Sequence, residues 1–292
     1  MNELHTGYLQ KHKDILTFRE LADSTIKNYT TYLTRFLEWA ESELACQDVK
    51  DISWEQIRSY ITYLRTQCGL NSVTVNVHIA QMRDFFEYVL HRTWDRHEVP
   101  TLRCDQKLPI VPTFDQVNII IDSIQNPKHK AEIALLYSSG IRACELCRLR
   151  CGDIQTSQSR IYISVSKNRH DRYAVLSHKA LELLIIYIRS SYPGASKGDW
   201  LFPGHNPGEH ITEESVRMVF KRALSDLGWD DKGFNLHSLR HAFGLHLYLS
   251  GVDLMTIKEA MGHKSLRSTE IYLTLGIGNG RSVMSPYDRS FR

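Results

Sequence analysis

The 292-residue sequence contains no apolar run long enough to cross a membrane. Its longest strongly apolar stretch, residues 181–188, is far shorter than the roughly 20 residues that a membrane-spanning helix needs. The first residues also lack the basic-then-apolar pattern of a secretory signal. We therefore expect a cytoplasmic protein without a membrane partner.

Cysteine is scarce, and six cysteines without a secretory signal are expected to be free thiols. Cys144, Cys147 and Cys151 have a spacing that resembles a metal cluster site, but the same spacing places all three on one stripe of a helix. No fourth ligand is evident nearby. His237 and His241 are four residues apart, yet the Glu of a zinc-protease helix is missing between them. We expect buried thiols, no metal and no cofactor.

The sequence has little excess charge, since its formal net charge at pH 7 is only +3. A value this small does not by itself indicate a nucleic-acid binder. The charge is unevenly divided: residues 1–112 contain 13 Lys and Arg against 15 Asp and Glu, whereas residues 113–292 contain 23 against 18. Positive charge therefore concentrates in the second half of the chain.

The length suits two domains, and the first is predicted to be all-helical. Amphipathic patterns predict helices over 24–43, 53–67 and 72–91, with Ser24 as a cap. The many aromatic residues at helical spacing in these segments are interpreted as core, not as base-stacking platforms: Tyr32, Trp39, Tyr60, Tyr63, Phe85, Phe86 and Tyr88.

Prolines interrupt the helical pattern after this first domain, because proline blocks helix continuation. They predict a helical domain at 1–95, a linker at 96–112, a second domain at 113–275 and a tail at 276–292. The second domain is predicted to be mainly helical with a small antiparallel sheet. Its expected helices cover 113–124, 128–138, 178–191, 213–227, 238–250, 254–261 and 265–273, and its expected strands cover 153–156, 160–164 and 172–176.

Four short motifs in the second half contain groups suited to attack on a phosphodiester. Residues 140–146 contain Arg142 and Glu145 at a predicted helix start. Residues 237–241 contain His237 and Arg240, 261–263 end in His263, and 269–272 end in Tyr272. Two guanidinium groups can hold two non-bridging phosphate oxygens, and a phenol can act as the nucleophile.

These motifs resemble the signature of the tyrosine recombinase (phage integrase) family, which is Arg, His-x-x-Arg, Gly-His and Tyr in that order. The resemblance covers roughly residues 113–275 and implies a SAM-like helical core-binding domain followed by the family's catalytic domain. Within the family, the chain resembles the simple two-domain members, which are Xer-like or of the integron and transposon type. It implies Tyr272 as the nucleophile of a 3′-phosphotyrosyl intermediate, with a phosphate site formed by Arg142, His237, Arg240 and His263 and supported by Glu145.

The resemblance also implies a general acid, because the family takes it from a lysine in a turn between two strands. Lys167 is the only lysine in residues 166–172, and Arg172 follows five residues later, as in the family pattern. Ser166 and Asn168 replace the usual glycines of that pattern. An ammonium group can release a proton to a leaving oxygen, whereas a guanidinium essentially cannot. Four further histidines are interpreted as satisfied core residues: His178, His210, His241 and His246.

The resemblance implies DNA integration, excision or resolution, as in a mobile element. The expected partners are double-stranded DNA with inverted-repeat sites, further copies of the chain in a tetramer on synapsed DNA, and accessory DNA-bending proteins. Two alternatives are a type IB topoisomerase that relaxes DNA and a non-catalytic DNA-binding regulator with the same fold. Sequence-specific synapsis would separate the first from a recombinase, and a covalent protein–DNA adduct would exclude the second.

Overall fold

The computed structural model describes residues 1–105, 107–164, 171–206 and 208–278. The chain divides into two compact units, Met1–Gln106 and Lys107–Arg292. The boundary between them lies inside the stretch that the sequence indicates as a linker. Each unit has its own hydrophobic core. Among the described residues, none of the helices is long and apolar enough to cross a membrane.

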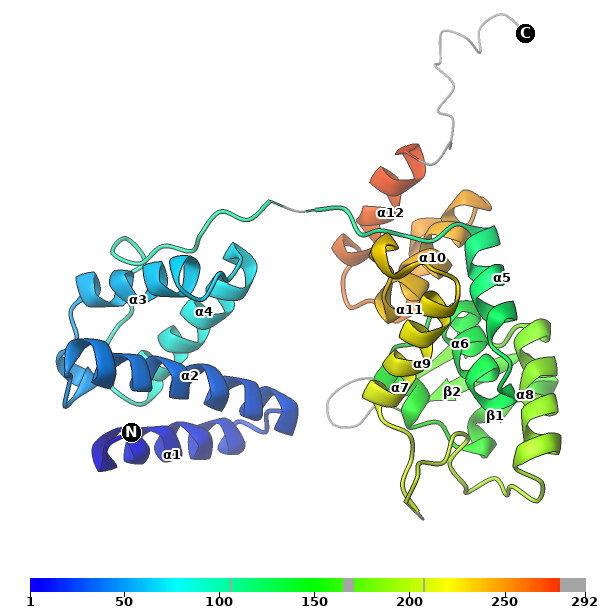
Figure 1. The fold of residues 1–292 in the computed structure, drawn as a ribbon, viewed down its shortest axis with the longest axis horizontal. Helices are drawn as coiled ribbons and strands as arrows, with labels where there is room; N and C mark the ends of the chain where they lie inside the picture. Colours follow the sequence, from blue (N-terminus) through cyan, green and yellow to red (C-terminus); the bar gives the residue numbers. More distant parts are fainter. Residues whose placement is uncertain (106, 165–170, 207, 279–292) are drawn as a thin grey trace, which may run out of the picture. The chain divides into compact units, whose positions relative to one another are not determined.

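The first unit consists of helices, coloured blue to cyan in Figure 1. They are α1 (Glu3–Phe18), α2 (Asp23–Leu44), α3 (Trp54–Thr66) and α4 (Ser72–Tyr88), with a short 3₁₀ turn, η1 (Val49–Asp51), after α2. The prediction of an all-helical domain is confirmed. Helix α1 was not predicted, because the side chains that it buries are His5, His12 and Leu16, so its apolar periodicity is weak.

Capping residues explain where these helices begin. Ser53 accepts from the backbone N–H of Gln56 at 3.2 Å and Gln56 Oε1 accepts from the backbone N–H of Ser53 at 2.8 Å, which makes a capping box at the start of α3. The prediction of a cap at Ser24 is wrong, because α2 begins at Asp23 after Ala22, which makes no side-chain cap.

The aromatic residues of this unit are mainly core, as predicted, with one clear exception. Trp39, Tyr60, Phe85 and Phe86 are buried together. Tyr88, however, is 46% exposed at the end of α4, where the guanidinium of Arg19 lies 4.7 Å from its ring centroid.

The second unit is mainly helical and contains a three-stranded antiparallel sheet, as predicted. The strands β1 (Ile154–Gln155), β2 (Arg160–Ile163) and β3 (Arg172–Val175) lie in the order of the chain, and Tyr162 pairs with Tyr173. The helices of this unit are α5 (Phe114–Ser123), α6 (Pro127–Ser139), α7 (Ala143–Cys147), α8 (His178–Ser191), α9 (Glu213–Asp226), α10 (Leu236–Leu249), α11 (Leu254–Met261) and α12 (Arg267–Gly278). Short 3₁₀ turns precede β1 (η2, Cys151–Asp153), follow it (η3, Thr156–Gln158) and follow α9 (η4, Asp230–Lys232).

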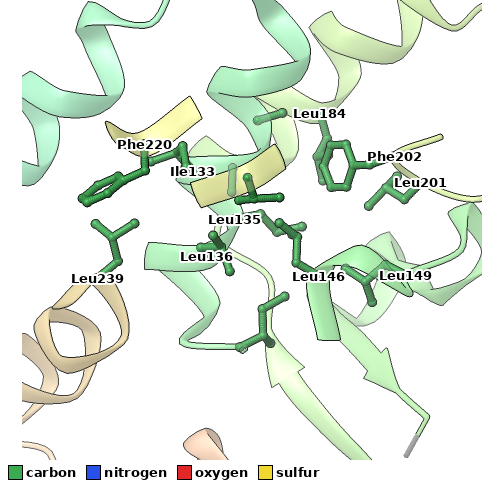
Figure 2. Packing of buried hydrophobic residues seen from close by; sticks show 14 of the residues in the cluster. Ile133, Leu135, Leu136, Leu146, Leu149, Leu184, Leu201, Phe202, Phe220 and Leu239 are labelled. Atoms are coloured by element: carbon green, nitrogen blue, oxygen red, sulfur yellow. The ribbon is translucent and has the colours of Figure 1, made fainter. Parts of the chain in front are cut away.

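The core of the second unit surrounds helix α6, which is buried along most of its length. Figure 2 shows Leu135 and Leu136 of α6 among the side chains of neighbouring elements, including Leu146 of α7 and Leu239 of α10. Helix α6 ends at Gly140, whose φ of +62° and close approach to Phe243 favour glycine, since an added Cβ would lie 2.6 Å from Phe243 Cε1. This packing fixes the start of α7 and the middle of α10 relative to the end of α6.

A separate apolar cluster joins the last three helices, which lie together in Figure 1. Phe243 and Leu245 of α10, Met261 of α11 and Tyr272 of α12 are buried in it. Helix α12 continues to Gly278, three residues into the segment expected to be a tail, and residues 279–292 lie outside the described part of the chain.

The cysteine prediction needs one correction. Cys144 and Cys147 lie on α7, but this helix ends at Cys147, and Cys151 lies in η2. The three thiols therefore do not share one helical stripe. All six cysteines are free, and only Cys147 is fully buried.

Candidate active site

Arg142 and Glu145 form the first part of the site at the start of α7. The backbone N–H of Arg142 donates to Glu145 Oε2 at 2.8 Å, and Arg142 Nη1 donates to Glu145 Oε1 at 3.1 Å. The Glu145 side chain is only 13% exposed. The carboxylate is therefore largely buried, and its capping interaction orients the Arg142 guanidinium more firmly than an exposed i, i+3 pair would.

Arg240 occupies the middle of the site and is almost completely buried. Its Nη1 donates to the carbonyl oxygen of Gly140, and its Nη2 donates to that of Met261 at 2.6 Å. These bonds tie α10 to the ends of α6 and α11. Burial, together with the nearby charge of Arg142, lowers the pKa of Arg240 to about 10, so the guanidinium stays protonated at neutral pH.

His237 lies one turn before Arg240 on the same face of α10. The helix begins at Leu236, two residues earlier than predicted, because the side chain of Asn235 accepts from the backbone N–H groups of His237 at 2.9 Å and Ser238 at 3.1 Å. His237 is exposed at this helix start, whereas Arg240 lies in the interior.

His263 follows Gly262, the left-handed residue that ends α11. Its Nδ1 lies 2.9 Å from the hydroxyl of Thr269, a buried residue of α12. Burial lowers the pKa of His263 to about 4, and the charges of Arg240 and Arg142 act in the same direction. His263 is therefore neutral at pH 7 in this conformation.

Tyr272 is fully buried. Its hydroxyl donates to Met261 Sδ at 3.5 Å, and its ring packs against Gly244, where an added Cβ would lie 2.7 Å from Tyr272 Oη. Burial raises the pKa of Tyr272 to about 12, although the charge of Arg240 opposes this shift. The phenol is therefore neutral and closed to solvent in this conformation.

His241 belongs to this site, contrary to its interpretation as a satisfied core residue. Its ring lies 4.7 Å from that of His237 and 6.2 Å from that of Tyr272, centroid to centroid. Its buried Nδ1 makes no hydrogen bond with any described residue. The sequence signal was its position directly after Arg240 and four residues after His237, on the same helix face.

The other three histidines lie away from these residues. His246 Nδ1 lies 2.9 Å from the hydroxyl of Tyr137, and His210 Nδ1 lies 2.6 Å from the carbonyl oxygen of Ile211. Both are satisfied within the fold. His178 is exposed at the start of α8, so its interpretation as a core residue is wrong.

Three of the predicted site residues act on a fourth: the charges of Arg240, Arg142 and His237 lower the pKa of His263. Lys167 lies in residues 165–170, outside the described part of the chain. Over the described ranges, no three His, Cys, Asp or Glu side chains are grouped so that they could hold a metal ion. The second unit is thus a helical domain in which a buried tyrosine lies near an arginine and a histidine, Arg240 and His241.

Comparisons with known protein families identify the class to which this fold and site belong. Residues 111–276 match the model of the Phage integrase family, and residues 8–96 match that of its N-terminal SAM-like domain. The chain belongs to the phage integrase family, that is, to the tyrosine recombinases. The two family models together cover most of both units.

Two curated relatives have recombinase names. A putative integrase/recombinase, y4qK, of Sinorhizobium fredii is 35% identical over 235 residues, which cover 80% of this chain and 75% of the relative. A tyrosine recombinase of Pseudothermotoga lettingae is 30% identical over 273 residues, which cover 91% and 92% of the two chains.

Two solved structures have the same fold. XerH site-specific recombinase bound to a palindromic difH substrate has a TM-score of 0.73 at 21% identity, covering 89% of this chain and 79% of that one. The Tn1549 transposon integrase in complex with circular intermediate DNA has a TM-score of 0.71 at 18% identity, covering 97% of both chains.

Proposed function

We propose that the chain cuts and rejoins double-stranded DNA through a covalent 3′-phosphotyrosyl link to Tyr272. The observation that carries this proposal is the convergence of distant segments on one site. Arg240 of α10 donates to the carbonyls of Gly140 and Met261, and these residues lie two positions before Arg142 and His263, respectively. The hydroxyl of Tyr272 contacts the side chain of the same Met261.

Each group of the site has a separate role in phosphoryl transfer. Arg142 and Arg240 bind the two non-bridging oxygens and offset the negative charge that develops on the phosphorus centre. His237 and His263 donate hydrogen bonds to the same oxygens. The Tyr272 phenol gives its proton to a neutral histidine of the site as its oxygen forms a bond to phosphorus. The bond to the 5′ oxygen breaks at the same time, and Lys167 supplies the proton that this leaving oxygen needs.

The covalent link keeps the energy of the broken phosphodiester, so a 5′ hydroxyl from another strand can reverse the step. That exchange of strands is the recombination reaction. The phenol must first leave its buried position, because it has no exposed surface and its hydroxyl is bonded to Met261. A shift of α12, on which Tyr272 lies, would bring the hydroxyl to the phosphate.

The proposed substrate is double-stranded DNA with inverted-repeat sites, bound in the cytoplasm by four copies of the chain, with accessory DNA-bending proteins. The DNA-bound XerH and Tn1549 integrase support DNA as the partner. The recombinase and integrase names of the relatives favour strand exchange over relaxation by a topoisomerase and over a non-catalytic regulator. The integrase relatives also support a role in a mobile element.

A selection followed by a cleavage assay tests this function. The Tyr272→Phe variant, which keeps every other group, is used to select binding duplexes from a randomised library. A nick near the scissile phosphate then traps the covalent product by releasing a short strand. We expect the wild-type chain to give an adduct on a denaturing gel and Tyr272→Phe to bind equally well without forming one. An adduct of wild-type yield from the variant would assign the attack to another residue.

A further inference from the structure

Arg172 is a largely buried arginine next to the proposed site, at the start of β3. Its side chain is 14% exposed, and its Nη2 donates to Glu145 Oε2 at 2.7 Å. Burial is the main cause that lowers its pKa; the Glu145 carboxylate opposes this shift and the Arg142 charge adds to it. The mechanism proposed above gives Arg172 no role.

The Glu145 carboxylate is shared between two arginines. Its Oε1 accepts from Arg142 Nη1 at 3.1 Å, and its Oε2 accepts both from the backbone N–H of Arg142 and from Arg172 Nη2. One carboxylate therefore fixes the backbone and guanidinium of Arg142 and the guanidinium of Arg172. A shift of Arg172 would change the geometry of Arg142 through this shared group.

The other contact of Arg172 is with the turn that precedes His263. Gly262 lies against the Arg172 side chain so closely that an added Cβ would lie 2.5 Å from Arg172 Cδ. Gly262 has a φ of +63° and ends α11. The Arg172 side chain thus contacts both the carboxylate that holds Arg142 and the turn that leads into His263.

One donor of Arg172 is not used within the described part of the chain. Its Nη1 is buried and makes no hydrogen bond with any described residue. A buried donor without a partner destabilises a fold, and replacement of both members of a buried ion pair by apolar side chains often costs no stability. If Arg172 only filled space between β3 and α7, methionine would serve equally well.

We propose that Arg172 is a positioning residue of the cleavage reaction, which holds Arg142 through Glu145 and the His263 turn through Gly262. It connects these two phosphate-binding groups to β3, the strand that follows the segment containing Lys167. This inference rests on the proposed function. It assigns no contact between Arg172 and the DNA.

The test compares Arg172→Met and Arg172→Lys with the wild-type chain on the selected nicked duplex. Single-turnover formation of the covalent adduct should fall by roughly 10–100-fold in Arg172→Met, the range typical for a partner that orients a ligating side chain. Arg172→Lys should recover part of this loss, because an ammonium can still pair with Glu145 but has no planar fork. DNA affinity should stay within error of the wild-type value. Arg172→Met should unfold at a lower temperature, because it removes one partner of a buried ion pair, but both variants should be folded at the assay temperature.

Arg160→Met is the matched control, since Arg160 lies in the same sheet but bonds to Gln155 and stacks 3.7 Å from the Tyr173 ring centroid. It should cleave at the wild-type rate. A double-mutant cycle with Glu145→Gln adds a second readout. The double variant should lose little more rate than the worse single variant, because both changes break one linked arrangement.

A duplex with a methylphosphonate at the scissile position gives a readout that general loosening of the fold would not change. This neutral phosphate needs less charge neutralisation, so the rate ratio of wild type to Arg172→Met should shrink on it. The inference would be overturned if Arg172→Met cleaved at the wild-type rate or if the rate losses in the double-mutant cycle were additive. An equal ratio of wild-type to Arg172→Met rates on the normal and the methylphosphonate duplex would also overturn it. Failure of the wild-type chain itself to form an adduct would instead overturn the proposed function.

Discussion

Arg142 and Arg240 differ sharply in environment, although both are proposed to bind the same phosphate. Arg240 is 3% exposed and bonded to two backbone carbonyls, whereas the Arg142 side chain is 35% exposed and held by Glu145. Arg240 therefore also supports the fold by joining α6, α10 and α11. Substitutions at Arg142 separate catalysis from folding more cleanly.

Arg142→Lys is expected to lose cleavage while it keeps the positive charge. A guanidinium can bond Glu145 and a phosphate oxygen at the same time, whereas an ammonium offers a single point of contact. We expect the adduct rate to fall by roughly 10²–10³-fold, the usual cost of one charge-stabilising donor. Arg148→Lys is the matched control, because Arg148 is exposed at the end of the same helix. Equal rates for wild type and Arg142→Lys would show that no fork is needed.

Lys167 is expected to be the general acid. Lys167→Ala should slow cleavage of normal DNA by roughly 10²–10⁴-fold. A 5′-thiol leaving group departs without protonation, so it should restore most of the rate to Lys167→Ala. It should not rescue Arg142→Ala, which lacks charge stabilisation. Equal rescue of both variants, or of neither, would place the acid elsewhere.

The sequence indicates which chemical groups belong to the proposed site but not the environment of each group. Residue type and order were sufficient to single out Tyr272, Arg240 and His263. Burial was not readable, because it depends on helices that are distant in sequence. Tyr272 is covered because Gly244 of α10 leaves room for its ring, and no pattern around Tyr272 itself indicates this.

At the scale of secondary-structure elements, α12 is the part that the proposed reaction needs to move. It is held by the buried Tyr272, by Leu275 and by the contact of Thr269 with His263. The ranges predicted for α8 and α11 match the structure, in which Ser177 and Asp253 cap the starts of these helices. Helix α12 has no such signal at its end, and it runs through Gly276 to Gly278.

Gly244→Ala is expected to loosen α12. An alanine Cβ at this position would overlap the buried Tyr272 ring, so the ring must move. This cost should exceed the gain of about 0.5–1 kcal/mol that alanine brings to a helix. Amide hydrogen exchange of residues 267–278 should become faster, whereas Gly7→Ala, with open space around its Cβ, should leave it unchanged. Unchanged exchange in Gly244→Ala would contradict the tight packing of Tyr272.

Helix α6 contains a buried carboxyl group that should make the second unit sensitive to pH. Burial raises the pKa of Glu132 to about 7, although the charge of Lys128 opposes the shift. The folded state therefore binds this proton more tightly than the unfolded state does. The stabilisation is complete below about pH 4.5 and is lost as the pH rises to 7, with an upper limit of roughly 3 kcal/mol.

Glu132→Gln should remove this dependence, because glutamine stays neutral. The variant should be more stable than the wild-type chain at pH 8 and similar to it at pH 4.5. Hydrogen exchange of the α6 amides at the two pH values measures the difference within the second unit alone. The matched control is Glu182→Gln on the exposed face of α8. A wild-type chain as stable at pH 8 as at pH 4.5 would contradict a buried ionisable Glu132.

At the scale of the whole molecule, the chain joins two units with separate cores. The two-domain prediction came from the end of helical periodicity and the prolines that follow it. The sequence did not predict α1, whose buried histidines His5 and His12 are held by Glu41 and Asp84. Pairs so distant in sequence leave no periodic pattern. The positive charge of the second half accords with a DNA backbone as partner, and the family assignment rests on both units.

The most direct test of the account is to identify the residue that becomes bonded to DNA. The wild-type chain is incubated with the selected nicked duplex in excess EDTA, digested with nuclease and protease, and analysed by mass spectrometry. The account predicts a nucleotide linked through its 3′ phosphate to Tyr272, formed as readily with EDTA as without it. A nucleotide on another residue, such as Tyr248, or strand cleavage that leaves no protein-bound nucleotide, would contradict it.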